Sequence, residues 1–188
     1  MATVTIRDGN RMLDEPKAVS EFLGQFGIWY RRFEGSDRVE DDASDQDILA
    51  AYDEPIRELM AEGGYRTADV INVTADTPGL EAMLDRFNKE HWHDEDEVRF
   101  VVRGRGLFHI HPKDGPVFSI EVEAGDMIKV PLGTRHWFDL CDDRTIRCIR
   151  LFQDPGGWTP HYTASGREGA YQPLCLGPGY IPPGLGRS

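Results

Sequence analysis

Short segments in which apolar and polar residues alternate fill the second half of the chain, separated by Gly, Pro and Asp. Alternation of this kind is typical of strands with one buried face. The segments are residues 97–102, 106–111, 117–122, 126–130, 135–140 and 145–152. Six strands at close, regular spacing predict an antiparallel sandwich or barrel.

The first half of the chain combines strand patterns with helical ones. Short runs of β-branched and aromatic residues predict strands at residues 4–6, 28–33 and 68–73. We expect a helix over residues 19–26 between the first two strands.

Two further helices are predicted before residue 91. Apolar residues recur at helical spacing over residues 47–62, which predicts a core-facing helix capped near Ser44 and stopped by Gly63-Gly64. A second helix opens at Thr77-Pro78 and has Leu80, Met83, Leu84 and Phe87 on one face.

The length of 188 residues is that of one ordinary domain. We expect a single domain over residues 1–188, with a helix and strand portion over about 1–90 and a barrel over about 91–165. Residues 34–47 carry seven carboxylates in fourteen positions, so we expect a solvated loop without a binding role. The tail at 177–188 is rich in Gly and Pro, and we expect it to wrap the surface or to be disordered.

The net charge of the chain argues against some classes of binding partner. With 21 basic and 33 acidic residues the net charge is −12, which repels nucleic acids and anionic membrane surfaces. No stretch approaches the roughly 20 apolar residues that span a bilayer, and no basic segment followed by an apolar run opens the sequence. We therefore expect a soluble, cytoplasmic protein that binds neither nucleic acid nor membranes.

The cysteines are Cys141, Cys148 and Cys175, an odd number without a Cys-x-x-Cys spacing. This pattern favours a reduced, intracellular chain.

Four residues have the composition of a metal site. His91 and His93 are followed by Glu97, and His136 lies 39 residues further along. Neutral imidazoles and a carboxylate are ligands that suit iron, nickel, copper or zinc. The simpler alternative is that His91 and His93 are surface histidines in an acidic turn.

Strand parity adds a fifth residue to this group. Successive side chains of a strand point to opposite faces, so Glu97 and Arg99 would share a face opposite to Val98 and Phe100. We expect the carboxylate and the guanidinium to face the barrel interior, where a divalent metal would compensate the buried charge of Glu97.

The spacing His-x-His-x3-Glu-x6-Gly, ending at Gly104, and the later Gly125-x5-Pro131-x-Gly133-x2-His136 resemble the paired motifs of the cupin superfamily. The resemblance implies a mainly β fold, a cupin double-stranded β-helix (jelly-roll barrel), with several helices contributed mostly by the N-terminal half. Asp85 and Leu140 depart from the family's Gly and Asn, and neither is a ligand position.

A narrower resemblance is to the acireductone dioxygenases of methionine salvage. It rests on residues 90–100, 104–108, 136–139 and 149–152, with further likeness at residues 61–65, 69–71 and 157–158. The similarity covers most of residues 25–165.

The resemblance implies a substrate and a cofactor. The substrate would be the acireductone 1,2-dihydroxy-3-keto-5-methylthiopentene, bound as a dianion and oxidised by O2. One Fe2+ per chain would give formate and 4-methylthio-2-oxobutanoate, whereas Ni2+ would give carbon monoxide, formate and 3-methylthiopropionate. The ligand types do not choose between the two metals. The family also implies a monomer.

The same resemblance implies roles for residues around the ligands. Arg99 would be the catalytic residue that favours the doubly ionised substrate, and its alternative is a structural ion pair with Glu97. Glu90 and Asp96 occupy positions that the family associates with metal incorporation and with the transmission of conformational change. From the residues alone, a solvated acidic side chain is the expectation for both.

Three aromatic residues, Phe87, Phe138 and Trp158, are candidates for an apolar wall that receives the methylthioalkyl tail, with ordinary core packing as the alternative. The other histidines, His109, His111 and His161, are expected not to be ligands.

Two further functions would also explain the four ligands. One is a cupin module that binds a small molecule through its metal without turnover. The other is a different cupin enzyme, an isomerase or a dioxygenase, that acts on another enediol.

Overall fold

The computed structural model describes residues 1–175 except residues 9, 34–38, 41 and 155–157. The predicted tail at 177–188 and part of the predicted acidic loop at 34–47 lie outside the described residues. Elsewhere the chain is mainly β, as predicted from the sequence.

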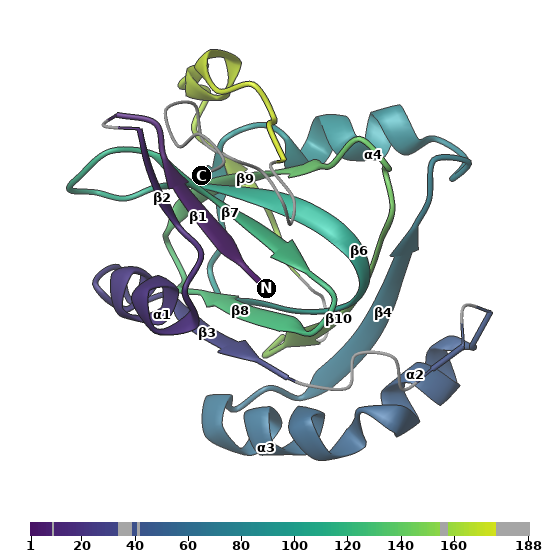
Figure 1. Ribbon diagram of the computed structural model, residues 1–188. Coiled ribbons are helices and arrows are strands. Elements are labelled where there is room, and N and C mark those ends of the chain that lie inside the picture. Colours follow the sequence, from purple (N-terminus) through teal and green to yellow (C-terminus); the bar gives the residue numbers. More distant parts are fainter. Residues whose placement is uncertain (9, 34–38, 41, 155–157, 176–188) are drawn as a thin grey trace, which may run out of the picture.

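The strands within the described residues form two antiparallel sheets joined through one long strand. They are β1 (Thr3–Ile6), β2 (Arg11–Leu13), β3 (Trp29–Arg32), β4 (Thr67–Val73), β5 (His91–Trp92), β6 (Glu97–His111), β7 (Phe118–Glu123), β8 (Asp126–Val130), β9 (Arg135–Leu140), β10 (Ile146–Phe152) and β11 (His161–Tyr162). Sheet A has the order β11-β5-β9-β6-β7-β1-β2, and sheet B has the order β4-β10-β6-β8-β3. Figure 1 shows how β6 curves from one sheet into the other.

A β-bulge lies where β6 passes between the sheets. Arg147 of β10 pairs with Arg103, but the next residue, Cys148, pairs with Val101, so Val102 is one residue too many on β6. An extra residue on one strand bends that strand and increases its twist. The sequence predicts two strands here, over 97–102 and 106–111, whereas the structure has one strand with an internal bulge.

The bulge also changes which residues of β6 face the interior. Val101 joins the interior cluster before the bulge, whereas Phe108 and Ile110 join it afterwards. Gly104 follows the bulge with φ of 75°, and a Cβ atom there would collide with the carbonyl oxygen of Thr145. The glycine of the first motif is therefore required by the backbone.

Two hydrophobic clusters hold the layers together. The first fills the space between the sheets with inward-facing side chains, among them Val4, Phe118 and Ile128. The second lies on the outer face of sheet B, where Phe100 contacts Tyr52 with ring centroids 4.9 Å apart. Phe100 thus lies on the opposite side of β6 from Arg99, as strand parity predicts.

The helices are α1 (Pro16–Gly24), α2 (Asp45–Ala51), α3 (Asp53–Gly63) and α4 (Leu80–Phe87), followed near the C-terminus by the short 3-10 helix η1 (Arg167–Ala170). In Figure 1, α2 and α3 run along the lower side of the molecule and α4 lies near β9. No described helix is long and apolar enough to cross a membrane.

The single helix predicted over residues 47–62 is wrong, because the chain breaks at Tyr52 into α2 and α3. Pro55 explains the break, since its missing N–H and its ring prevent a regular turn onto the carbonyl of Ala51. The predicted cap is confirmed: Ser44 and Asp47 form a capping box at the start of α2. Gly64 ends α3 in the left-handed conformation.

Most of the remaining predicted elements are confirmed with shifted ends. The structure adds three short strands that the sequence pattern does not predict, β2, β5 and β11. The predicted helix at 19–26 begins earlier, at Pro16, because proline suits the first turn. Strands of two or three residues are too short to produce an alternation signal.

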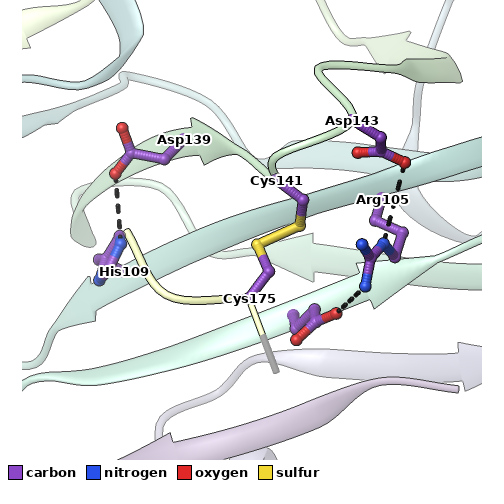
Figure 2. The surroundings of a disulfide bond; sticks show 7 residues. Arg105, His109, Asp139, Cys141, Asp143 and Cys175 are labelled. Carbon is purple, nitrogen blue, oxygen red and sulfur yellow. Dashed lines mark hydrogen bonds and ion pairs between the residues drawn. A yellow bond between two sulfur atoms is a disulfide. The ribbon is translucent and has the colours of Figure 1, made fainter. Parts of the chain in front are cut away.

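The expectation that all three cysteines are reduced is wrong. Cys141 and Cys175 form a disulfide across a sequence separation of 34 residues, and only Cys148 is free. Figure 2 shows that this bond joins the end of β9 to the C-terminal segment. Sequence spacing cannot detect such a pair, because the fold brings the two residues together.

The disulfide anchors a C-terminal segment that covers part of the outer face of sheet A. Within this segment the Tyr171 ring lies 5.8 Å from the Trp137 ring, and the Arg7 guanidinium lies over the Tyr171 ring at 5.4 Å. Trp137 and His109 stack beneath it at 4.8 Å, and both are almost completely buried. The segment after β11, which ends at Cys175, thus covers part of the outer face of sheet A.

Breaking the disulfide should destabilise the protein. In the chain-entropy model a bridge across a loop of this length contributes about 4 kcal/mol, so reduction or a Cys141→Ser substitution should lower the melting temperature clearly. Protein purified without reductant should show one thiol per chain after denaturation, and three after reduction. A Cys141→Ser/Cys175→Ser variant should lose the response to reductant. Three thiols in the unreduced protein would disprove the bridge.

Candidate metal centre

Four side chains converge inside the barrel near one end of β6. His91 lies in β5, His93 follows it, Glu97 is the first residue of β6 and His136 is the second residue of β9. Their potential ligand atoms all lie within 4.8 Å of one another. All four residues are buried, with exposed fractions of 2–5%. The alternative of surface histidines in an acidic turn is therefore wrong.

Backbone carbonyl groups orient the three imidazoles. The Nδ1 atoms of His91, His93 and His136 lie 2.6, 3.0 and 2.8 Å from carbonyl oxygens. The acceptors are those of Lys89, Thr159 and Thr134. A carbonyl can only accept, so each Nδ1 donates a hydrogen and Nε2 is the ring nitrogen left to face the interior of the group. Such outer hydrogen bonds are the usual support of metal-binding histidines.

The turn before β9 connects the two halves of the site. The Gly133 amide donates to the carbonyl of His93 at 2.9 Å, and Gly133 has φ of 71°. This bond joins the β8–β9 turn to the segment that carries the first two histidines. The Gly and Pro positions of the second motif therefore hold His136 at the start of a strand, as predicted.

The carboxylate of Glu97 is the electrostatic centre of the group. Its Oε2 lies 3.1 Å from Nε2 of His93 and 2.9 Å from Nε2 of His136. Burial alone would raise the pKa of Glu97, but Arg99 and the two histidines hold this pKa well below its usual range. Glu97 is therefore a buried anion.

The pKa values of His91 and His93 shift in opposite directions. Burial and the neighbouring His136 lower the pKa of His91 to about 4, so this ring is neutral at pH 7. Burial also lowers the pKa of His93, but the hydrogen bond and the negative charge of Glu97 outweigh it and raise the pKa above its ordinary value.

The group fits a divalent transition metal. Three imidazole nitrogens and one carboxylate form a donor set that such ions accept, and the ion's charge would compensate Glu97. The carbonyl-held Nδ1 atoms already direct the other ring nitrogens to the ligand side. A metal site is therefore present at His91, His93, Glu97 and His136.

Arg99 lies beside the metal ligands, as strand parity predicts. Its Nε donates to Oε1 of Glu97 at 2.6 Å, and the residue is only 4% exposed. The guanidinium packs near the rings of Phe108, Phe138 and Trp158, at 5.8, 5.2 and 5.2 Å. Aromatic faces stabilise a cation that is removed from water.

A cavity of about 440 Å³ opens beside one metal ligand, His93, and Arg99. Its walls include His93 and Arg99, together with two of the three predicted aromatic residues, Phe87 and Trp158. Phe138 instead lines a small neighbouring space of about 20 Å³, between Arg99 and the apolar side chains of α4. The structure thus brings all three aromatic residues close to Arg99, but only two of them line the larger cavity.

Glu90 is not the solvated acidic residue expected from its local sequence. It is 2% exposed, and its carboxylate accepts hydrogen bonds at 2.6 Å from both His111 and Thr163. The amide of Thr163 also donates to the Glu90 carbonyl at 3.1 Å. Partners 21 and 73 residues away replace the lost water, and local sequence does not reveal them.

Asp96 also differs from the expectation of a solvated side chain. Its carboxylate accepts from the amide of Leu132 at 3.0 Å and from the hydroxyl of Tyr65 at 3.3 Å, and its side chain is 20% exposed. Asp96 directly precedes Glu97, so its side chain joins the start of β6 to the turn that precedes His136.

The other histidines lie outside the four-residue group, as expected. His109 is buried against Trp137, and its Nε2 lies 3.3 Å from Asp139 (Figure 2). His161 stacks on Trp92 at 4.3 Å and bonds to Asp94 at 2.5 Å.

Sequence reasoning missed the residues that support the site from outside. Thr159 acts through its backbone carbonyl, which leaves no side-chain signal. Arg150 and Asp69, an ion pair that lines the cavity, fall within stretches that resemble the family but have no metal-ligand spacing.

The chain resembles known proteins over most of its length. The ARD/ARD' family model matches residues 15–160. A relative named acireductone dioxygenase from Picosynechococcus sp. is 41% identical over 176 residues, covering 94% of this chain and 100% of the relative. Another of the same name from Stutzerimonas stutzeri is 43% identical over 153 residues, covering 81% and 84%.

The fold also matches that of a solved structure with the same name as these relatives. It is described as acireductone dioxygenase from Bacillus anthracis with a cadmium ion in the active center. It has 38% sequence identity and a TM-score of 0.81, and the match covers 86% of this chain and 98% of that chain. Together with the buried three-histidine, one-glutamate group, this similarity confirms the predicted mainly β cupin barrel.

Removing one ligand should abolish stoichiometric metal binding. We expect His136→Ala to lose the ion, because three ligands and a vacant position bind a metal much less tightly than four. His161→Ala is the matched control, since its ring is outside the group and partly exposed. Elemental analysis of the purified proteins measures both. Equal metal content in His136→Ala and the unmodified protein would contradict the assignment.

Proposed function

The chain belongs to the ARD/ARD' family, and on this basis we propose that it catalyses the oxidation of an acireductone by O2. It is an oxidoreductase of the dioxygenase class. The substrate that we propose is 1,2-dihydroxy-3-keto-5-methylthiopentene, an intermediate of methionine salvage. Both atoms of O2 enter the products, so no further reductant is needed.

The observation that carries this proposal is one cavity that contains both a metal ligand and a guanidinium. His93 and Arg99 line the same space of about 440 Å³, which is large enough for a small substrate. An acireductone is an acidic enediol with adjacent oxygens, so it needs a chelating site and a positive charge at the same place. A module that binds a neutral small molecule through its metal has no need for the second feature.

Arg99 would stabilise the ionised substrate. Its guanidinium stays charged at any physiological pH, and an opposite charge at close range lowers the pKa of an acidic group by about 1–3 units. The hydrogen bond to Glu97 and the surrounding rings hold the guanidinium in one orientation. We assign Arg99 as the catalytic residue that favours the dianion.

The ligands His91, His93, Glu97 and His136 would hold Fe2+, one ion per chain, with Ni2+ as the alternative. The bound ion supplies Lewis-acid chemistry and a chelating position for the substrate oxygens. With iron the proposed products are 4-methylthio-2-oxobutanoate and formate. With nickel they are 3-methylthiopropionate, formate and carbon monoxide.

Apolar side chains would receive the remainder of the substrate. Phe87 and Trp158 line the cavity and are suited to a methylthioalkyl chain. Phe138 contacts Arg99 from the other side, so we propose that it positions the guanidinium and closes the apolar wall.

Glu90 and Asp96 would act on the site through their neighbours. Glu90 fixes the start of β5 through His111 and Thr163, which supports a role in building the metal site. Asp96 connects the Glu97 segment to the β8–β9 turn through Leu132, which supports a role in transmitting small movements.

The remaining properties are proposals of the same kind. We propose a monomeric, cytoplasmic enzyme with a small-molecule substrate and no nucleic-acid or membrane partner. The family resemblance supports the monomer. The cytoplasmic location rests on the family's pathway alone, because the Cys141–Cys175 bridge removes the argument from reduced cysteines.

The activity can be tested directly. Iron-loaded protein mixed with acireductone in air should consume O2 and acireductone in equal amounts and release formate and the keto acid. Nickel-loaded protein should release carbon monoxide in addition to formate. Oxygen consumption no faster than in a protein-free control would refute the proposed function.

The proposed role of Arg99 can be tested separately. Arg99→Met should lower kcat/KM by about 100-fold or more, because one preorganised charge is lost where substrate charge is concentrated. Activity of the variant should recover partly at high pH, where the substrate ionises without help. Arg57→Met, an exposed arginine on α3, is the matched control. If Arg99→Met retains its metal and also full activity at neutral pH, Arg99 is only structural.

A further inference from the structure

A second guanidinium lies in the cavity that contains Arg99. Arg150 is in β10, where its Cα pairs with Arg99 of β6 on one side and with Asp69 of β4 on the other. It shares a face of β10 with Cys148, whose sulfur lies 3.8 Å from Nη1 of Arg99. Arg150 therefore points to the same side of the sheet as the metal ligands, and it lines the cavity.

The position of the Arg150 guanidinium is well defined. Its Nε and Nη2 donate to the two carboxylate oxygens of Asp69 at 2.8 and 2.6 Å. Its Cζ lies 5.2 Å from the Phe152 ring and 5.6 Å from the Trp158 ring. Among the described residues no group accepts a hydrogen bond from Nη1. One amino group of a fixed guanidinium thus has no partner within the described part of the chain.

The two cations of the cavity lie at different depths. Arg99 has a side-chain exposure of 5%, whereas Arg150 has 21% and its partner Asp69 has 47%. Both guanidinium groups lie near the Trp158 ring, at 5.2 and 5.6 Å from its centroid. Arg150 is therefore the cation nearer to solvent, and Trp158 connects it with the one nearer to the metal ligands.

The overall charge of the protein makes such a cation useful. A chain of net charge −12 repels an anion at long range, but salt screens this field beyond about 8–10 Å. Within that distance, individual charges at the mouth of the cavity decide whether an anion enters. A partly exposed, oriented guanidinium is suited to this task.

We propose that Arg150 is a second anion-binding residue of the cavity, which receives the ionised acireductone at the solvent side and orients it toward Arg99. This inference rests on the proposed function, since it takes an anionic substrate as given. Asp69 positions the guanidinium and neutralises part of its charge. The competing interpretation is that Arg150 and Asp69 form a cross-strand pair that only joins β4 to β10.

Steady-state kinetics of Arg150→Gln test the proposal. We expect the KM for acireductone to rise about tenfold, the size of one hydrogen bond to a charged group, and kcat to change less than about twofold. The KM for O2 should be unchanged, because O2 has no charge. Arg150→Lys retains the charge without the planar geometry, so its KM for acireductone should lie between those of the unmodified protein and Arg150→Gln. Unchanged KM for acireductone in Arg150→Gln would overturn the proposal.

Asp69→Asn separates substrate binding from a structural ion pair. Replacing the carboxylate by an amide leaves Arg150 charged and removes one of the two oxygens that accept from it, so the KM for acireductone should stay equal or fall. A purely structural pair predicts instead that Asp69→Asn and Arg150→Gln raise KM equally and lower the melting temperature equally. That outcome would also overturn the proposal. A raised KM in Asp69→Asn would by itself count against the proposal, even if Arg150→Gln folds poorly.

Two controls complete the experiment. Arg31→Gln removes the same charge from an exposed pair with Glu58, so it should leave the KM unchanged and exclude an effect of net charge. Calorimetric titration with 4-methylthio-2-oxobutanoate, an anionic probe, should show binding to unmodified protein that weakens about tenfold in Arg150→Gln. Equal binding to both would count against Arg150. Failure of unmodified protein to oxidise acireductone would instead refute the proposed function.

Discussion

The buried negative charge of Glu97 is the constraint on which the rest of the site depends. A carboxylate taken out of water is costly unless hydrogen bonds and opposite charges replace the solvent. Here Arg99, His93 and His136 all contact it, and each of them is held by other parts of the chain. The same arrangement leaves the ligand nitrogens directed at one point, where a metal ion completes the compensation.

The bulge in β6 allows one strand to line both the polar end and the apolar end of the barrel interior. Before the bulge, β6 presents Glu97 and Arg99 to the interior, and afterwards it presents Phe108 and Ile110. A regular strand of the same length would turn one of these sets outward, because a shift of one residue exchanges the faces. The polar end of the barrel interior and its apolar end are thus produced by one strand with one extra residue.

Segments distant in sequence complete the site from outside. Thr159 and Thr163 follow β10, yet they hold His93 and Glu90, and the segment after them is joined to β9 by the Cys141–Cys175 bridge. The cavity has a similar origin, since Arg150 and Asp69 come from neighbouring strands of sheet B. The precision of the ligand geometry therefore depends on packing across both sheets.

The sequence by itself determined the four ligands and the face shared with Arg99, through the spacing within two short motifs and through strand parity. Its alternating segments, together with the resemblance to cupins, determined the mainly β barrel. Only the tertiary structure decided the burial of Glu90, the disulfide and the pairing of Arg150 with Asp69. The physical reason is that these features depend on side-chain contacts between residues 21 to 81 positions apart, which neither motif spacing nor the period of a strand reveals.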